Sequence, residues 1–336
     1  MYKRRGVSTE NALIAAVITV VAAAAVFVIL KSDPTGKGGS KLSKEFVFSD
    51  SEYRRTDPAL IHYREVQRIE TNFQSVRGLT VGPDDRIYIA GDRAVKVLGS
   101  DGKRISEIAM DDSPRCLAVS ADGTVYVGMT DYVEVHSPQK PPAKWSSLGE
   151  KADITSIAIS GDNVFVADSG NSVVLRYDSG TDISGKIPGR IGRADKTKDI
   201  PGLLVRYAGV DVAAGAEGVL WVTNPGLWRV EAYSFDGDLK SHWGRQSEEI
   251  DGFCGCCNPT AIALLPGGAF VTVEKGLPRV KVYDDCGLFV GVVAGPESFP
   301  AGAVGFDLAV DSQGRIMVLD TAEKAVRIFT LKKDDK

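Results

Sequence analysis

The chain has 336 residues, 43% of them apolar and 25% charged, and a formal net charge of −4. This acidic balance argues against a nucleic-acid-binding protein, because such proteins concentrate Lys and Arg to neutralise phosphates. Length and apolar content fit either one large core or two ordinary ones, so internal repeats have to decide the number of domains.

An apolar segment runs from Ala12 to Leu30, and Thr19 is its only polar residue. About 20 helical residues cross the roughly 30 Å apolar core of a bilayer, so we predict a transmembrane signal-anchor helix over residues 12–31. A cleaved signal peptide is the alternative, although its apolar core usually has only about 7 to 15 residues. The length of the segment favours an uncleaved anchor.

Charges around this segment predict its orientation. Three basic residues precede it, Lys3, Arg4 and Arg5, whereas Lys31 alone follows directly. Because basic residues are retained on the cytoplasmic side, we expect residues 1–11 in the cytoplasm and the bulk of the chain in a periplasmic or extracellular compartment. Residues 32–59 begin with a stretch rich in Gly, Ser and Lys, and we interpret them as a tether and lead-in.

The rest of the chain repeats one unit six times: an apolar strand, a turn, a second apolar strand, a polar turn and a third strand. The spacing of about 40 to 50 residues is typical of propeller blades, and strand residues alternate as β-strands require. The copies read RGLTVGPDDRIYIAGDRAVKVL, RCLAVSADGTVYVGMTDYVEV, TSIAISGDNVFVADSGNSVVLRY, AGVDVAAGAEGVLWVTNPGLWRVEAY, TAIALLPGGAFVTVEKGLPRVKVY and FDLAVDSQGRIMVLDTAEKAVRIF.

A fourth strand is available to five of the copies, as in Ile105 to Ala109, but few residues follow Phe329 in the sixth. The segment from Leu60 to Ile69 precedes the first copy and has no blade of its own. We therefore expect it to pair beside the strand that ends at Phe329, because ring closure removes exposed sheet edges. The predicted fold is all-β, a six-bladed β-propeller over residues 60–331.

The copies resemble NHL repeats, most clearly at Val166 to Asn171, which reads VADSGN and is similar to the turn of that family. The resemblance covers roughly residues 60 to 330 and implies a six-bladed propeller. It implies little about activity, because this architecture occurs in binding modules, lyases, lactonases and scaffolds alike.

Each blade places one oxygen-bearing side chain in the turn between its second and third strands, a turn expected to face the channel mouth. These residues are Asp92, Asp131, Asp168, Asn224, Glu274 and Asp320. A ring of carboxylates suits a divalent cation such as calcium. The alternative is that Asp and Asn bond their own backbone in tight turns. The last four are candidate ligand-binding residues.

Two arginines occupy the same repeat position in adjacent blades, Arg77 and Arg115. Guanidinium groups near a channel mouth favour an anionic ligand, since each binds a carboxylate or phosphate through two parallel hydrogen bonds. We predict that they belong to the ligand-binding mouth. The alternative is that they form ion pairs with Asp92, Asp111 or Asp112.

Three thiols stand close together in the loop that enters the fifth blade, at Cys254, Cys256 and Cys257. The spacing suits a disulfide with one thiol left over or a thiolate site for a soft metal, and an ordinary loop is the third alternative. Asn258 replaces the histidine of a haem attachment motif. Cys286 is the obvious fourth sulfur, but it is expected in a turn at the opposite end of the blade.

These features favour a binding or scaffold module for a protein, peptide or glycan over an enzyme. The sequence shows no Ser-His-Asp arrangement, zinc-binding histidine triad or glycine-rich phosphate loop in a suitable context. Two alternatives stay open. One is a metal-dependent hydrolase or lyase with its ion in the central channel, and the other is a thiol metal-binding or redox module that uses the cysteine loop.

Overall fold

The computed structural model describes residues 18–21, 54–179, 186–187, 191–198, 200–205 and 209–332. The chain divides into two units, Met1–Glu52 and Tyr53–Lys336. Residues 18–21 of the first unit form a helical turn, and most of the predicted anchor at 12–31 lies outside the described residues. In the described part of the chain, no helix has the length and apolar character needed to cross a bilayer.

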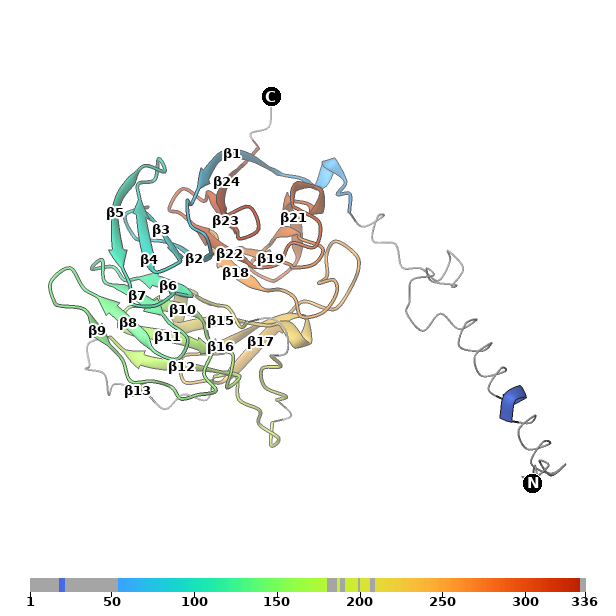
Figure 1. Cartoon of the computed structure of the whole chain (residues 1–336), viewed down its shortest axis with the longest axis horizontal. Coiled ribbons are helices and arrows are strands. Elements are labelled where there is room, and N and C mark those ends of the chain that lie inside the picture. The colour runs from blue at the N-terminus through green and yellow to red at the C-terminus, as the bar shows by residue number, and fades with distance from the viewer. Residues whose placement is uncertain are drawn as a thin grey trace, which may run out of the picture. The chain divides into compact units, whose positions relative to one another are not determined.

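The second unit folds into six antiparallel sheets of four strands each, which confirms the predicted all-β six-bladed propeller. Figure 1 shows β2, β6, β10, β18 and β22 toward the centre and β5, β9 and β13 toward the rim. The first three blades are β2(Val76–Val81) to β5(Arg104–Ala109) with β3(Ile87–Gly91) and β4(Ala94–Leu98); β6(Cys116–Val119), β7(Val125–Gly128), β8(Val133–His136) and β9(Ala143–Lys144); and β10(Ile154–Ser160), β11(Asn163–Asp168), β12(Val173–Asp178) and β13(Lys186–Ile187).

The remaining blades follow the same strand order, and the last one takes its outer strand from the start of the unit. They are β14(Val212–Ala214), β15(Val219–Asn224), β16(Arg229–Ser234) and β17(Leu239–Trp243); β18(Ala261–Leu264), β19(Phe270–Val273), β20(Val280–Tyr283) and β21(Phe289–Ala294); and β22(Phe306–Val310), β23(Ile316–Asp320), β24(Ala325–Leu331) and β1(Tyr63–Glu70). Short 3-10 turns lie at Pro58–Leu60, Ala216–Gly218, Pro225–Leu227 and Pro296–Ser298.

Strand composition follows from the packing of sheet against sheet. All five residues of β3 and of β23 are buried, whereas β5 is mostly exposed. A middle strand contacts both neighbouring sheets and is therefore apolar on both faces, while an outer strand meets water. One core cluster, for example, joins Leu79 and Ile87 of the first blade to Met317 and Ile328 of the last. Burial of apolar surface between blades is the main stabilising term.

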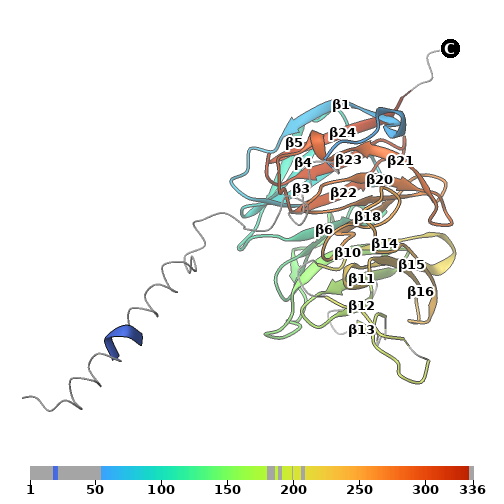
Figure 2. The ribbon, with the colours of Figure 1, turned by 90° about the vertical axis from the view of Figure 1, so that its right-hand side faces the viewer.

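The ring closes where the sequence analysis expects it to close. β1 runs antiparallel to β24, from the Tyr63 and Leu331 pair to the Glu70 and Ala325 pair, and Figures 1 and 2 both show β1 beside β24. Arg327 of β24 also forms an ion pair with Glu65 of β1. The outer edge of the last sheet is thereby satisfied by the N-terminal strand.

Alternation of strand direction gives the propeller two different ends. The turns between second and third strands, and the loops that enter each inner strand, share one end, which we call the mouth end. The hairpin turns between first and second and between third and fourth strands lie at the other end, because antiparallel neighbours reverse direction at each connection. By this topology, all predicted site residues except Cys286 lie in segments at the mouth end.

Candidate functional site

The oxygen-bearing side chains of the mouth-end turns bind the backbone of their own blades. Asp92 accepts hydrogen bonds from the N–H groups of Gln74, at 2.8 Å, and Ser75, at 2.7 Å. The bond from Gln74 contributes most to lowering the pKa of Asp92. Asp168 is 1% exposed and accepts from the N–H of Asp153 at 3.0 Å. Both carboxylates tie a turn to the loop that enters the inner strand of the same blade.

Asn224 and Glu274 make the same link in the fourth and fifth blades. Asn224 Oδ1 accepts from the N–H of Leu204 at 3.0 Å, and Glu274 Oε2 accepts from the N–H of Cys254 at 2.8 Å. Both side chains are 0% exposed. They are buried structural links, and neither presents a free polar atom to a ligand at the mouth.

Asp320 binds the backbone of its own turn, and Asp131 binds a side chain of the loop after β9. Asp320 Oδ1 accepts from the N–H groups of Ala322, at 3.0 Å, and Glu323, at 3.1 Å. Asp131 accepts a short hydrogen bond from the hydroxyl of Ser147. Burial raises the pKa of Asp320, and its Oδ2 is buried with no hydrogen-bond partner among the described residues. Turn and loop structure thus accounts for most of these oxygens.

Arg77 and Arg115, in contrast, line a common cavity. Both line a cavity of about 460 Å³ that also contains Thr155 and Thr321. Arg77 is exposed and makes no hydrogen bond or ion pair within the described part of the chain. Arg115 forms an ion pair with Asp153, with its guanidinium nitrogen 2.6 Å from the carboxylate oxygen.

The partner of Arg115 differs from those weighed from the sequence, which were Asp92, Asp111 and Asp112. Asp92 is engaged by the backbone, and Asp111 pairs with Lys144 at 2.9 Å. The neighbouring blade supplies Asp153 instead, because its inner-strand loop lies beside Arg115 at the mouth end. Such a contact joins residues far apart in sequence and has no local signal.

A second cavity, of about 420 Å³, shares Arg77, Thr155 and Gly305 with the first and adds Lys275. We call the two cavities together the mouth site. Their lining brings together two guanidinium groups, one ammonium group and the carboxyl groups of Asp211 and Asp307. Lys275 was not singled out from the sequence, where it reads only as one more polar turn residue.

Two carboxyl side chains, Asp211 and Asp307, line both the second mouth cavity and a further cavity of the channel. This further cavity of about 260 Å³ is bordered by residues of all six inner-strand segments. Burial raises the pKa of Asp211 to about 6 and that of Asp307 to about 7, the latter also through the charge of Asp211. Sequence reasoning missed this pair, although its signal is a shared Gly-x-Asp-x-Ala pattern at 209–213 and 305–309.

Both channel carboxylates also link neighbouring blades. Asp211 Oδ2 accepts from the N–H of Ile262 at 2.6 Å. Asp307 Oδ2 accepts from the N–H of Leu79 at 2.7 Å. Each acidic side chain therefore satisfies a backbone donor of the next inner strand, which explains why an Asp is tolerated in an apolar strand.

The cysteine loop borders the mouth site without lining it. Cys254, Cys256 and Cys257 lie between β17 and β18, and neither mouth cavity includes them. The sulfurs of Cys256 and Cys257 lie 2.7 Å apart. Burial raises the pKa of Cys254.

A buried ionic cluster fixes the backbone of this loop. Glu274 pairs with Arg279 at 2.7 Å and with Lys281 at 2.6 Å. Arg279, Lys281 and the hydroxyl of Tyr283 then donate to backbone carbonyls of residues 248–252. Burial lowers the pKa of Lys281 to about 8. Alternating polar residues in an otherwise apolar strand, RVKVY, are the sequence signal for this anchor.

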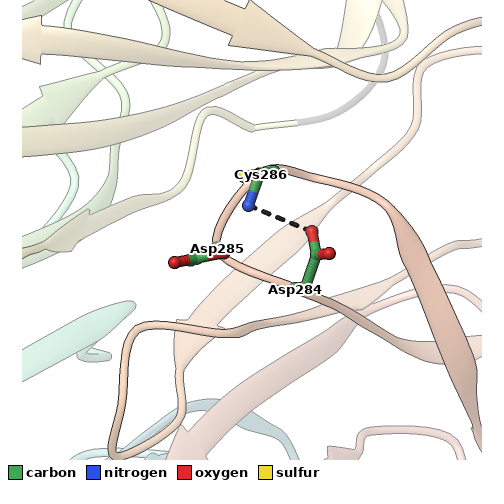
Figure 3. Close-up of side chains that lie close together, drawn as sticks. All are labelled: Asp284, Asp285 and Cys286. Carbon is green, nitrogen blue, oxygen red and sulfur yellow. Dashed lines mark hydrogen bonds between the residues drawn. The ribbon is translucent and has the colours of Figure 1, made fainter.

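Figure 3 shows Asp284, Asp285 and Cys286 in the turn between β20 and β21, at the end opposite the mouth. Among the described residues, this is the one group of three His, Cys, Asp or Glu side chains whose ligand atoms lie within 4.8 Å of one another. Asp284 Oδ1 accepts from the N–H of Cys286 at 3.0 Å. The cluster is an exposed turn stabilised by Asp284, and the oxygen ring at the mouth end forms no comparable group.

No family model and no curated protein sequence matches the chain. Solved structures do. A structural genomics protein of unknown function from Bacteroides thetaiotaomicron is 15% identical, with 80% of this chain and 72% of that chain covered and a TM-score of 0.58. Virginiamycin B lyase from Staphylococcus aureus is 13% identical, with coverage of 80% and 100% and a TM-score of 0.54. The WD40 β-propeller domain of Doa1 is 12% identical, with coverage of 81% and 98% and a TM-score of 0.54. Identities this low show the propeller fold alone.

Proposed function

We propose that the chain is an NHL-type binding propeller that captures a protein, peptide or glycan through an anionic group held at the mouth site. We propose further that the helix at residues 12–31 anchors it in a membrane and displays the propeller outside the cytoplasm. A tether of this kind keeps the propeller at the membrane surface, which raises its effective concentration toward partners there. We propose no direct role for nucleic acid.

One observation carries the proposal: Arg77 is exposed on two connected cavities and has no partner in the described structure. An unpaired guanidinium offers a fork of donors that matches a carboxylate. Arg115 lies on the same cavity, and its ion pair with Asp153 holds it in place. Cavities of about 460 and 420 Å³ accept a side chain or a chain terminus of a partner.

Acidic peptides test this function. We would titrate the full chain, in detergent, with peptides that end in a free carboxylate and with the same peptides in amidated form. The carboxylate peptides should bind and the binding should weaken with salt, because Coulomb attraction at an exposed site is screened. Arg77→Gln should lower affinity by about tenfold or more, as charged hydrogen bonds contribute roughly 1.5 to 3 kcal/mol.

Arg104→Gln is the matched control, because Arg104 is an exposed arginine of β5 that pairs only with Glu107 in the described chain. It removes the same charge from the whole molecule and leaves the mouth site intact. Equal loss of binding in both variants would assign the effect to net charge and would contradict a specific site at Arg77.

The channel carboxylates favour a second candidate, a hydrolase or lyase that uses a divalent cation. Asp211 and Asp307 lie at one level of the channel with raised pKa values, and a cation there would polarise a substrate carbonyl or activate water. Two carboxylates alone make a poor calcium site, which takes 6 to 8 oxygens. Metal analysis of chain purified without chelator tests it, and a stoichiometric ion lost in Asp307→Asn would support it.

A further inference from the structure

We propose that Cys256 and Cys257 form a dithiol that closes reversibly into a vicinal disulfide by exchange with external disulfides. Cys256 is the entry thiol and Cys257 is the resolving thiol. The inference concerns the loop between β17 and β18 and is independent of the ligand at the mouth site. It assigns a modification site to the loop and names its reaction partners as small-molecule or protein disulfides.

The sulfurs of Cys256 and Cys257 are in direct contact. Cys256 Sγ is 2.7 Å from Cys257 Sγ, compared with about 2.05 Å in a disulfide. Cys257 has a φ of 67°, a left-handed conformation that a residue with a side chain adopts only where its surroundings impose it. The backbone of the loop therefore holds the two thiols on the same side, instead of letting adjacent side chains diverge.

The surroundings that impose this geometry can be named. Asn258 Nδ2 donates to the carbonyl of Cys254 at 2.6 Å, and Asn258 Oδ1 accepts from the N–H of Lys275 at 2.9 Å. Trp228 Nε1 donates to the carbonyl of Gly255 at 2.7 Å. Together with the buried ionic cluster around Glu274, these side chains fix the backbone on both sides of the dithiol. These hydrogen bonds indicate a fixed loop geometry rather than a flexible connection.

Exposure separates the roles of the two thiols. Cys256 is exposed, whereas Cys257 is 2% exposed. A bulky disulfide can reach the sulfur of Cys256 but not that of Cys257, and access is one of the factors that decide which thiol reacts. After the first exchange, Cys257 is the nearest thiol to the new mixed disulfide.

The other cysteines are placed less well for this reaction. Cys254 is partly buried, and among the described residues its sulfur does not lie within 4.8 Å of both other thiols as a group of three. Burial also raises the pKa of Cys254, which lowers its thiolate fraction. Cys286 lies at the opposite end of the blade, and Cys116 is buried in the inner strand β6.

The reaction balances in two exchanges. The thiolate of Cys256 attacks one sulfur of a disulfide RSSR, which forms a mixed disulfide at Cys256 and releases one thiolate RS⁻. The thiolate of Cys257 then attacks Sγ of Cys256, which forms the vicinal disulfide and releases the second RS⁻. The two protons of the protein thiols pass through water to the two leaving thiolates. The protein loses two electrons, and the external disulfide gains them.

Oxidised glutathione is the probe for the test. The reduced full chain carrying Cys286→Ser, which removes the remote exposed thiol, is incubated with the probe. Peptide mapping after alkylation should find one internal bridge, between Cys256 and Cys257, and intact mass should show the loss of two hydrogens. In the same background, Cys257→Ser should stop at a glutathione adduct on Cys256.

Cys256→Ser should make Cys257 at least about tenfold slower to react than Cys256 is in the parent, because the remaining thiol is shielded. Circular dichroism of each variant checks that the propeller is folded, and the mapping on the parent chain needs no loop variant at all. A bridge that includes Cys254, or a stable glutathione adduct on Cys256 in the parent, would overturn the proposal.

Discussion

Glu274 and Arg77 lie at the same end of the propeller, but the structure uses them in opposite ways. Glu274 is 0% exposed and has two buried cations and a backbone N–H as partners. Arg77 is exposed and has no partner in the part of the chain that the structure describes. Position at the mouth end therefore does not make a residue a binding residue. The decisive property is whether the fold has already engaged its polar atoms.

Removal of Glu274 is the most damaging change that this comparison predicts. Glu274→Ala leaves Arg279 and Lys281 buried without their counter-charge, and loss of one partner of a buried ion pair typically costs about 3 to 5 kcal/mol. Urea denaturation should show that loss in the free energy of unfolding. Glu107→Ala, at an exposed ion pair, is the control and should change stability by less than about 1 kcal/mol.

Asp168 should follow with an intermediate effect. Asp168→Ala leaves the N–H of Asp153 and the side chain of Asn171 without their acceptor, and an unsatisfied buried group costs about 1 to 3 kcal/mol. Asp168→Asn keeps one carbonyl oxygen and should recover part of the loss. Equal stability of the Ala variant and the parent would show that the turn does not depend on this residue.

The channel pair predicts a smaller, pH-dependent effect. The pKa of Asp307 is raised to about 7 from its ordinary 3.8, so the folded chain binds more protons than the unfolded chain between these pH values. Stability from this group therefore falls as pH rises from about 4 through 7.

Asp307→Asn does not titrate, and this difference can be measured. The difference in free energy of unfolding between variant and parent should shift in favour of the variant by at least about 1 kcal/mol from pH 5 to pH 8. One pKa unit corresponds to roughly 1.4 kcal/mol. Parallel denaturation curves at both pH values provide the check. A constant difference between the two chains would contradict the raised pKa.

Arg115 should have the smallest effect on stability. Its ion pair with Asp153 is partly exposed, with side-chain exposures of 28% and 42%, and such pairs contribute about 0 to 1 kcal/mol. Arg115→Gln should therefore unfold close to the parent in urea and still bind carboxylate peptides more weakly. A large loss of stability would place Arg115 with the buried links instead.

The propeller itself could be predicted from the sequence because its signals are local and repeated. Apolar alternation marks each strand, and the orphan segment at residues 60–69 falls where β1 pairs with β24. Arg77 and Arg115 line one cavity, as equal repeat positions in adjacent blades are neighbours in a ring.

The state of the mouth-end residues could not be predicted in the same way. The bonds of Asp92 and Glu274 reach backbone groups about 20 residues away, and the bond of Asp211 to Ile262 crosses between blades. Periodicity shows which face a side chain takes but not which distant donor meets it. For this reason the sequence predicts which polar residues lie at the mouth end. The structure is needed to show which of them already bind other protein groups and that Arg77 does not.

The most direct test compares binding and stability in one variant. Arg77→Gln should weaken the capture of a peptide with a free terminal carboxylate by about tenfold or more, while its urea midpoint stays at that of the parent chain. Retention of full affinity by this variant, at low salt and with a folded propeller, would contradict the assignment of the mouth site.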